Sequence, residues 1–459
     1  MVASSTRVRL AFLPVGSPGN LPACGHDEVE VIDIEETDEA VDLVERVCAL
    51  DIGKAALTVC IRVPHDDKPG HRRQEVREHA TTTRSLLDLA ARLHAAGVTL
   101  VAMEATSDYW KPAFYLLEAE GFTCWLLNAR HVKNVPGRPK TDKLDAVWLA
   151  KVVERGMCRP SFVPPAPIRR LRDLTRYRRT LIRERTREKQ RVEKLLEDAQ
   201  IKLSSVASDI FGVSGRHMLQ AMIAGQRDPK VLAQLARASM RAKIRQLEEA
   251  LTGHFDDHHG FICQMMLERI DELTSRIEEL TARIDEQVAP FAAQVAQLDA
   301  VTGIGGVCAQ ELIAELGVDM AVFPTAAHLV AWAKFAPQAN TSAGKAKTAA
   351  TGKGNPWLAA SLGEIAVTAG RTNTFLGERY RRIAKRRGKQ RALVAVGNSV
   401  LTIVWHLLAD PHASYCDLGP DFYQSRSSRH RQEHNLIRQL QQLTGKTVTL
   451  TPRPATPAA

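Results

Sequence analysis

The sequence predicts an α/β domain near the N-terminus, followed by a mainly helical remainder. Up to about residue 160, short and fully apolar segments alternate with helical patterns. Strands of that kind are typical of a sheet whose two faces are both covered. Farther along the chain, long stretches carry apolar residues at spacings of three and four, which indicates helices. The chain has 459 residues, enough for two or three domains.

Each element of the α/β domain has its own local signal. The segment VCALDIGKAALTVCIRV (47–63) predicts a strand, a turn at Gly53 and a second strand. Glycine, proline and polar clusters then punctuate the chain. The remaining elements are a helix over 82–96 with Gly97 as its C-cap, a strand over 98–104, a helix over 110–121, a strand over 122–129 and a helix from near Thr141.

Two long helices are predicted next, over 169–199 and 262–288. Apolar residues of the second stretch are spaced 4, 3, 4, 3, 4 from Met266 to Ile284, which fits either a coiled coil or an ordinary bundle helix. An antiparallel hairpin of the two helices would satisfy both interpretations. The whole chain is thus divided into an acidic disordered leader (1–46), the α/β domain (47–160), a helical and coiled-coil region (165–292), a mainly helical C-terminal domain (298–415) and a polar tail (420–459).

Composition narrows the functional classes. No run of eighteen apolar residues occurs, so no transmembrane helix is expected. The eight cysteines are scattered without a C-x-x-C pair, which argues against a zinc site or a disulfide framework and fits a reducing cytoplasm. The net charge is +10 although residues 27–46 hold ten acids and one arginine, and two basic runs, 169–194 and 379–391, indicate a polyanionic partner.

Acidic side chains stand at the ends of predicted strands and on one helix face. Strand-end acids occur in LDIGK and MEATSDYW, and KTDKLDA places two more three residues apart on a helix. In an α/β sheet, strand ends and the next helix can converge on one crevice. The four acids are Asp51, Glu104, Asp142 and Asp145.

Four converging carboxylates repel one another unless cations neutralise them. An all-oxygen ligand set suits Mg²⁺ or Mn²⁺, and two such ions about 3.5–4 Å apart are the usual device for displacement at phosphorus. Each acid taken alone is more ordinarily a surface or capping group. The prediction of a metal site therefore depends on all four acids acting together.

These motifs resemble the RuvC-like DEDD domain of a family of insertion-sequence transposases, whose members are recombinases guided by a structured bridge RNA. The resemblance extends to the C-terminal part and covers about residues 47–420. It implies an RNase H-like N-terminal domain, a coiled coil and a helical transposase domain. The C-terminal motifs that carry it are TGIGGVCAQELIAELG, APQANTSAGKAK, GKGNPWLAASLGEIA and RYRRIAKRRGKQRALVAVGNSVL.

The resemblance also implies the chemistry. Ser342 is the implied nucleophile, which attacks a DNA phosphate to leave a phosphoserine while the metal site assists. Residues alone permit this, because Gly344, Lys345 and Lys347 suit close approach to phosphate, but a serine in such a loop is ordinarily inert. Implied partners are double-stranded DNA, a guide RNA and further copies of the chain in a dimer or tetramer, in the cytoplasm of a prokaryote beside the nucleoid.

Further residues are predicted to contact nucleic acid. The turn in TGIGGVCAQEL resembles a helix-hairpin-helix, whose glycines let backbone N–H groups face phosphate, although tight helix connections also use glycine. Basic residues of the 379–391 run would contact phosphates, against the ordinary interpretation of a solvated helix face. The predicted contacts are Gly303, Gly305, Lys345, Lys347, Arg379, Arg381, Arg382, Lys385, Arg386, Arg387 and Lys389.

Three alternatives stay open at this point. A RuvC-type metal-dependent junction nuclease would need the four acids but no covalent intermediate, so it would tolerate loss of Ser342. A sugar-kinase or actin-like ATPase also begins with Asp-x-Gly on a strand, but the sequence has no second phosphate motif or adenosine loop. A nucleic-acid scaffold without activity would be indifferent to loss of the acids.

Overall fold

The computed structural model describes the backbone of residues 44–67, 71–105, 107–128, 142–337, 340–342, 345–347, 351–425 and 429–449. Side chains are described over the same ranges except at 142–144, 340–342, 345–347, 424–425 and 429–432. The chain divides into two compact units after Val163. Nearly all of the predicted leader, and the last ten residues of the tail, lie outside the described residues.

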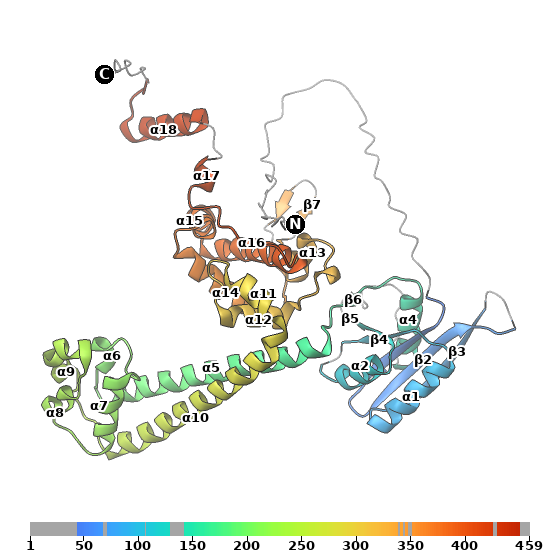
Figure 1. Ribbon diagram of the computed structural model, residues 1–459, viewed down its shortest axis with the longest axis horizontal. Helices are drawn as coiled ribbons and strands as arrows, with labels where there is room; N and C mark the ends of the chain where they lie inside the picture. The colour runs from blue at the N-terminus through green and yellow to red at the C-terminus, as the bar shows by residue number, and fades with distance from the viewer. Residues whose placement is uncertain are drawn as a thin grey trace, which may run out of the picture. The chain divides into compact units, whose positions relative to one another are not determined.

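A mixed six-stranded sheet forms the first unit (Figure 1). Its strands are β1 (Val47–Ile52), β2 (Ala56–Pro64), β3 (Arg72–Ala80), β4 (Leu100–Glu104), β5 (Thr123–Leu127) and β6 (Pro160–Ser161). They lie in the order β3-β2-β1-β4-β5-β6. Strands β1, β2 and β3 are antiparallel, β1, β4 and β5 are parallel, and β6 pairs antiparallel with β5. This is the RNase H-like arrangement that the resemblance implies.

Helices cover both faces of this sheet because its inner strands are apolar on both sides. Alternate residues of β1 and β4, such as Leu50 and Met103, pack with α1 (Thr83–Ala95) and α2 (Trp110–Ala119). The intervening residues, such as Ala49 and Ala102, pack with α4 (Asp142–Glu154). The predicted α/β fold and its apolar strands are therefore confirmed.

Two strands of the sheet, β3 and the two-residue β6, were not predicted. Strand β3 has the sequence RRQEVREHA and is half-exposed or exposed along its whole length. It pairs only with β2, at the edge of the sheet, so it needs no apolar face. Charged side chains on an edge strand also discourage pairing with other molecules. An apolar pattern could not reveal it.

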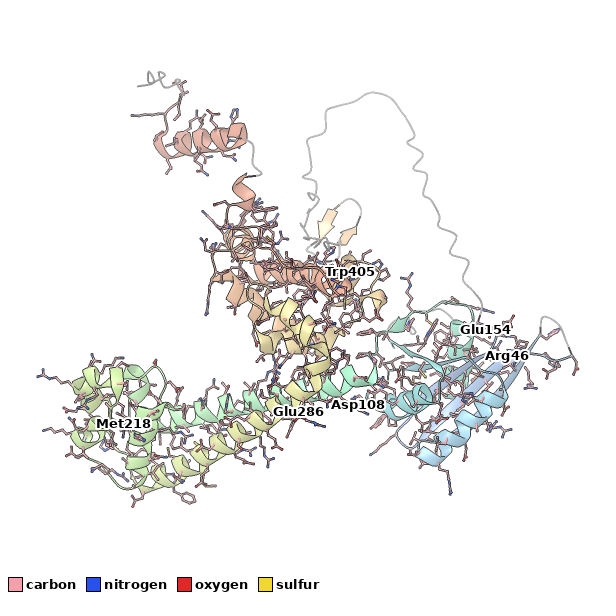
Figure 2. The ribbon with its side chains drawn as sticks, in the orientation of Figure 1. Arg46, Asp108, Glu154, Met218, Glu286 and Trp405 are labelled. Atoms are coloured by element: carbon pink, nitrogen blue, oxygen red, sulfur yellow. The ribbon has the colours of Figure 1, made fainter. Side chains whose placement is uncertain are left out.

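Glu154, labelled in Figure 2, fixes the C-terminal end of α4 to the sheet. Its carboxylate accepts hydrogen bonds from Arg62 Nε of β2 at 2.6 Å and from Arg72 Nε of β3 at 2.9 Å. Arg62 pairs with Val47 at the start of β1, so α4 ends where β1 begins. Burial acts to raise the pKa of Glu154, but hydrogen bonds from Arg62 and Arg72 outweigh it and lower that pKa.

Glu154→Gln is expected to destabilise the first unit by about 1–3 kcal/mol at pH 7, because it leaves two partly buried arginines without their carboxylate. The folded-state pKa lies below the unfolded one, so the stabilisation is present above about pH 4.5 and is lost as the pH falls through the folded value. Hydrogen exchange of β1 and β2 amides in the full chain measures it. Exposed Glu120→Gln is the control, and an equal Glu154→Gln effect at pH 7 and pH 3 would contradict the prediction.

The second unit begins with two long helices joined by a small helical cluster. Helices α5 (Ala166–Asp198) and α10 (Asp257–Val288) are antiparallel, since His259 Nε2 lies 3.3 Å from Asp198 and Arg185 donates to Thr274 at 3.2 Å. Between them in sequence come α6 (Leu203–Val206), α7 (Val213–Ile223), α8 (Pro229–Gln234) and α9 (Ile244–Ala250), which share a core with the adjacent ends of both long helices.

The predicted apolar stripe of 262–288 is confirmed as the buried side of α10. Ile270, Leu273, Ile277 and Ile284 are buried, with Leu273 and Ile277 packed against Leu181 of α5. The antiparallel pairing is thus observed, whereas supercoiling of the pair stays a prediction.

The rest of the second unit is a helical domain with one small hairpin. Its helices are α11 (Ala292–Asp299), α12 (Gly306–Leu316), α13 (Ala326–Trp332), α14 (Pro356–Gly370), α15 (Phe375–Arg387), α16 (Lys389–Ala409), α17 (Phe422–Ser425) and α18 (Arg429–Thr444). Within the described ranges, α16 alone is long and apolar enough to cross a membrane. More than half of its most apolar stretch (56%) is buried, as in the core helix of a globular domain.

Candidate functional site

Two of the predicted acids lie side by side at the carboxyl ends of parallel strands. Leu50 of β1 is in register with Met103 of β4, so the next residues along the two strands are Asp51 and Glu104. Successive side chains alternate between faces, and Leu50 and Met103 belong to the α1–α2 side. Asp51 and Glu104 therefore lie on the α4 side, where both are half-buried.

Helix α4 carries the other two acids toward the same end. Ala146, Leu149, Ala150 and Val153 form its buried stripe against the sheet. Because Glu154 is fixed beside the start of β1, the helix runs antiparallel to that strand. Thirteen residues of helix span about 20 Å, enough to pass the roughly 13 Å from Val47 to Asp51. Its first turn, with Asp142 and Asp145, thus lies toward the carboxyl ends of β1 and β4.

The structure brings the backbone of the four acids toward one end of the sheet. Among the described residues, no group of three or more His, Cys, Asp or Glu side chains could hold a metal ion. The side chain of Asp142 lies outside that description. Asp51, Glu104 and Asp145 each take part in a polar or electrostatic interaction.

Ser342 lies in a short hairpin, whereas the sequence predicts a loop rich in Gly, Ser, Thr and Lys over 336–356. Strands β7 (Asn340–Ser342) and β8 (Lys345–Lys347) are antiparallel, with Ser342 paired to Lys345. Ser342 is thus the last residue of β7, and Lys345 is the first residue of β8. The side chains of Ser342, Lys345 and Lys347 lie outside the described residues. We call residues 336–354 the serine hairpin; it belongs to the second unit and the acids to the first.

The helix-hairpin-helix turn gives its two predicted glycines different roles. Gly303 has φ +94°, and a Cβ there would stand 2.8 Å from the Ile365 carbonyl oxygen of α14. Glycine is needed at this position for close helix packing. Gly305 caps the N-terminus of α12, is exposed and has open space around its Cα. Of the two, only Gly305 stands where an anion could approach the helix end.

Two family models match this chain, one over its N-terminal part and one over its C-terminal part. Residues 48–201 match the model of a family described as "Transposase", the DEDD transposases of the IS110 group. Residues 295–381 match the family described as "Transposase IS116/IS110/IS902 family". The two matches together include just over half of the chain.

The chain belongs to the IS110 family of DEDD transposases. No curated protein matches it. Among solved structures, "Thermus thermophilus RuvC structure" is 14% identical, with 25% of this chain and 99% of that chain covered and a TM-score of 0.20. "T. thermophilus RuvC in complex with Holliday junction substrate" is also 14% identical over the same shares, with a TM-score of 0.19.

Membership of the IS110 family makes the chain a DNA-processing enzyme. The ATPase and scaffold interpretations are therefore excluded. Nothing in the comparisons favours the plain junction nuclease over a transposase.

Only part of the transposase's basic run at 379–391 is available for a partner. Arg379 donates to the Tyr423 hydroxyl at 2.9 Å, Arg381 donates to the Thr372 carbonyl at 2.8 Å, and Arg382 lies over the Tyr423 ring. These three arginines hold α15 within its own domain. The other basic residues of the run are all exposed and stand at or just after the α15–α16 junction: Lys385, Arg386, Arg387, Lys389 and Arg391.

The basic run of α5 was predicted as a phosphate surface, and the structure corrects this for four of its arginines, which contact α12. Arg176 donates through Nε and Nη2 to Glu315 of α12, both at 2.8 Å, and Arg172 donates to the Glu315 carbonyl. Arg179 is 7% exposed and pairs with Glu311. Arginines bound to buried carboxylates are not free to contact phosphates.

Arg178 is more deeply buried still, with 2% of its surface exposed. It donates to Gln310 at 3.2 Å, and its Nη2 has no hydrogen-bond partner in the described part of the chain. Burial lowers the pKa of its guanidinium. The sequence did contain a sign of these partners, since Gln310, Glu311 and Glu315 are the polar residues of a helix that is otherwise apolar.

Proposed function

We propose that this transposase cuts and rejoins DNA through a covalent bond to Ser342, assisted by divalent metal at the four acids and guided by a structured RNA. The observation that supports the proposal is that the carboxyl ends of β1 and β4 and the first turn of α4 lie toward the same end of the sheet. Asp51 and Glu104 follow paired residues of β1 and β4, and α4 brings its first turn toward them. Family membership supplies the DNA substrate.

The donor set fits Mg²⁺ or Mn²⁺. The residues that would hold the ions are Asp51, Glu104, Asp142 and Asp145, which offer only carboxylate oxygens, the ligands that hard cations prefer. Bound there, the metal would withdraw charge from the phosphate oxygens and from the leaving oxygen. Half-burial of Asp51 and Glu104 strengthens their attraction for a cation, because fewer waters compete.

The covalent step conserves the energy of the phosphodiester. The Ser342 hydroxyl oxygen forms a bond to phosphorus, the bond from phosphorus to one deoxyribose oxygen breaks, and that oxygen takes up a proton in place of the one lost by serine. The resulting phosphoserine can be attacked by another deoxyribose hydroxyl, which reverses the bond changes. Rejoining therefore needs no external nucleotide.

The acids and Ser342 belong to different units of the chain. We infer that the acids of one protomer act with the serine hairpin of another, in a dimer or tetramer. Within the second unit, we expect the α5–α10 pair to supercoil as a coiled coil. Double-stranded DNA and the guide RNA are the inferred partners, in the cytoplasm of a prokaryote beside the nucleoid.

Of the predicted phosphate contacts, the exposed α15–α16 junction and Gly305 are best supported by their surroundings. Replacing Lys385, Arg386 and Arg387 together by Gln is expected to weaken duplex binding and to reduce the slope of log Kd against log salt by up to about 3, one per lost contact. Fluorescence anisotropy between 50 and 200 mM salt is the measurement. A loss of helix-end stabilisation accompanies the change, so melting temperatures are compared as well.

A matched control removes three exposed basic residues from the α6–α9 cluster: Lys230, Arg241 and Arg245. If this triple variant lowers the salt slope as much as the junction variant does, the junction is not the specific phosphate surface.

The test of the proposed function combines strand exchange with RNA sequencing. Purified transposase is expected to carry a reproducible noncoding RNA from DNA that flanks its gene. With that RNA, element-end DNA and Mg²⁺, end-labelled strands should migrate with the protein on a denaturing gel. Full strand exchange in excess chelator, or exchange with no adduct at any time, would contradict the proposal and favour a RuvC-type junction nuclease without a covalent intermediate.

A further inference from the structure

The segments that enter and leave the serine hairpin, here called its two stems, attach it to the helical domain. The entering stem packs against α16. The Phe335 ring fills a notch at Gly397, where a Cβ would stand 2.5 Å from the ring. Asn398, the next residue of α16, donates from Nδ2 to the Phe335 carbonyl at 3.3 Å. The chain therefore enters the hairpin from a fixed point.

The returning stem lies against the entering one and ends at Asn355. A Cβ on Gly354 would stand 2.7 Å from the Ala333 carbonyl oxygen, so the two stems are in close backbone contact. Asn355 then caps α14, with Oδ1 accepting from the Trp357 amide at 3.0 Å and from the Leu358 amide at 3.4 Å. Capping uses only the oxygen of the side-chain amide.

The nitrogen of the same amide has a separate partner. Asn355 Nδ2 donates to Glu315 Oε2 at 2.5 Å. Glu315 is 3% exposed and accepts hydrogen bonds from Nε and Nη2 of Arg176, with Arg172 Nε at 3.5 Å. Asn355 thus ties the end of the hairpin to the buried carboxylate of an ion pair between α5 and α12.

We propose that Asn355 and Glu315 are positioning residues for Ser342; the inference rests on the proposed function. Ser, Thr and Asp cap a helix about as well as Asn, so capping alone does not call for an amide. Only the amide also donates to Glu315. A two-stranded hairpin has little stability of its own, so its stems set the place of Ser342. A shift of about 1 Å in a reacting group can slow a reaction about 100-fold.

The test compares variants that keep the cap but change the Glu315 contact. Asn355→Asp still caps α14 yet offers Glu315 a repelling carboxylate in place of a donor. We expect it to slow adduct formation about 10- to 100-fold in single-turnover assays, with the Kd for DNA within about twofold. Asp228→Asn, a cap change at α8 in the helical cluster, is the control and should leave the rate unchanged.

A second substitution provides a rescue. Glu315→Gln in the Asn355→Asp chain restores a donor and an acceptor with their places exchanged, so most of the rate should return, as a double-mutant cycle can show. If Asn355 and Glu315 served only the stability of the fold, the double variant should be slower than Asn355→Asp, because Glu315→Gln also weakens the ion pair with Arg176. An Asn355→Asp rate equal to wild type, or no rescue, would overturn the inference.

Hydrogen exchange separates this inference from the proposed function, since it needs neither DNA nor chemistry. Asn355→Asp should speed exchange of the β7 and β8 amides at least tenfold, and the double variant should restore protection. If wild type forms no adduct, the serine chemistry fails while exchange still decides the positioning role. Unchanged exchange in Asn355→Asp would refute that role.

Discussion

Ser342→Ala is expected to abolish the covalent protein–DNA adduct, a loss of at least about 10⁴-fold, because alanine has no oxygen to form the bond to phosphorus. Assembly with DNA and RNA should persist, since the hydroxyl ends a short strand whose pairing uses backbone groups. Denaturing gels with end-labelled DNA measure the adduct, and gel shifts measure assembly.

The neighbouring residue supplies the matched control for this prediction. Thr341→Ala removes a hydroxyl from the same strand, one position away, and should retain most of the adduct. If Ser342→Ala still yields the adduct, or if Thr341→Ala abolishes it equally, Ser342 is not the nucleophile.

Asp51→Asn should reduce strand cleavage by at least about 10³-fold while the Kd for DNA stays within a few-fold. The variant keeps the size of the side chain but removes one of the charges proposed to bind metal. Asp145→Asn should behave in the same way, because both acids lie toward the same end of the sheet. Single-turnover cleavage in Mg²⁺ and in Mn²⁺ is the measurement.

Metal binding also has a readout without catalysis. An ion that binds only the folded state raises the melting temperature with its concentration. Mg²⁺ should therefore stabilise the wild-type chain and have little effect on Asp51→Asn. Asp108→Asn is the control, since Asp108 follows β4 but its side chain is 81% exposed. Equal Mg²⁺ stabilisation of wild type and Asp51→Asn would contradict the predicted ligand role.

Much of the first unit could be predicted because its signals are local. Apolar runs predicted β1, β2, β4 and β5. The strand-end acids were noticed because a charge at the end of a buried strand costs free energy unless it is paired or bound to a cation. Strand β3 was not predicted because an exposed edge strand needs no apolar face. The serine hairpin was not predicted because its strands have three residues each, too few to show the alternating pattern of a strand.

The basic helix α5 shows where composition misleads. Twelve basic residues in 169–199 look alike in sequence, and charge alone predicted one surface. The fold divides them into bound and exposed residues. Glu311 and Glu315 of α12, more than 130 residues away in sequence, bind Arg179 and Arg176. Which arginines are buried depends on packing between distant helices, and no local pattern carries that information.

By itself, the sequence determined the α/β and helical classes, the four acids, Ser342 and the family resemblance, because each depends on residues close together in the chain. Tertiary structure decided which of these residues converge and which are already engaged. Arg62 and Arg72 bind Glu154 and so orient α4 toward Asp51, and Glu315 joins Arg176 to Asn355 below the serine hairpin. Such contacts connect positions tens of residues or more apart, and their partners are chosen only when the chain has folded.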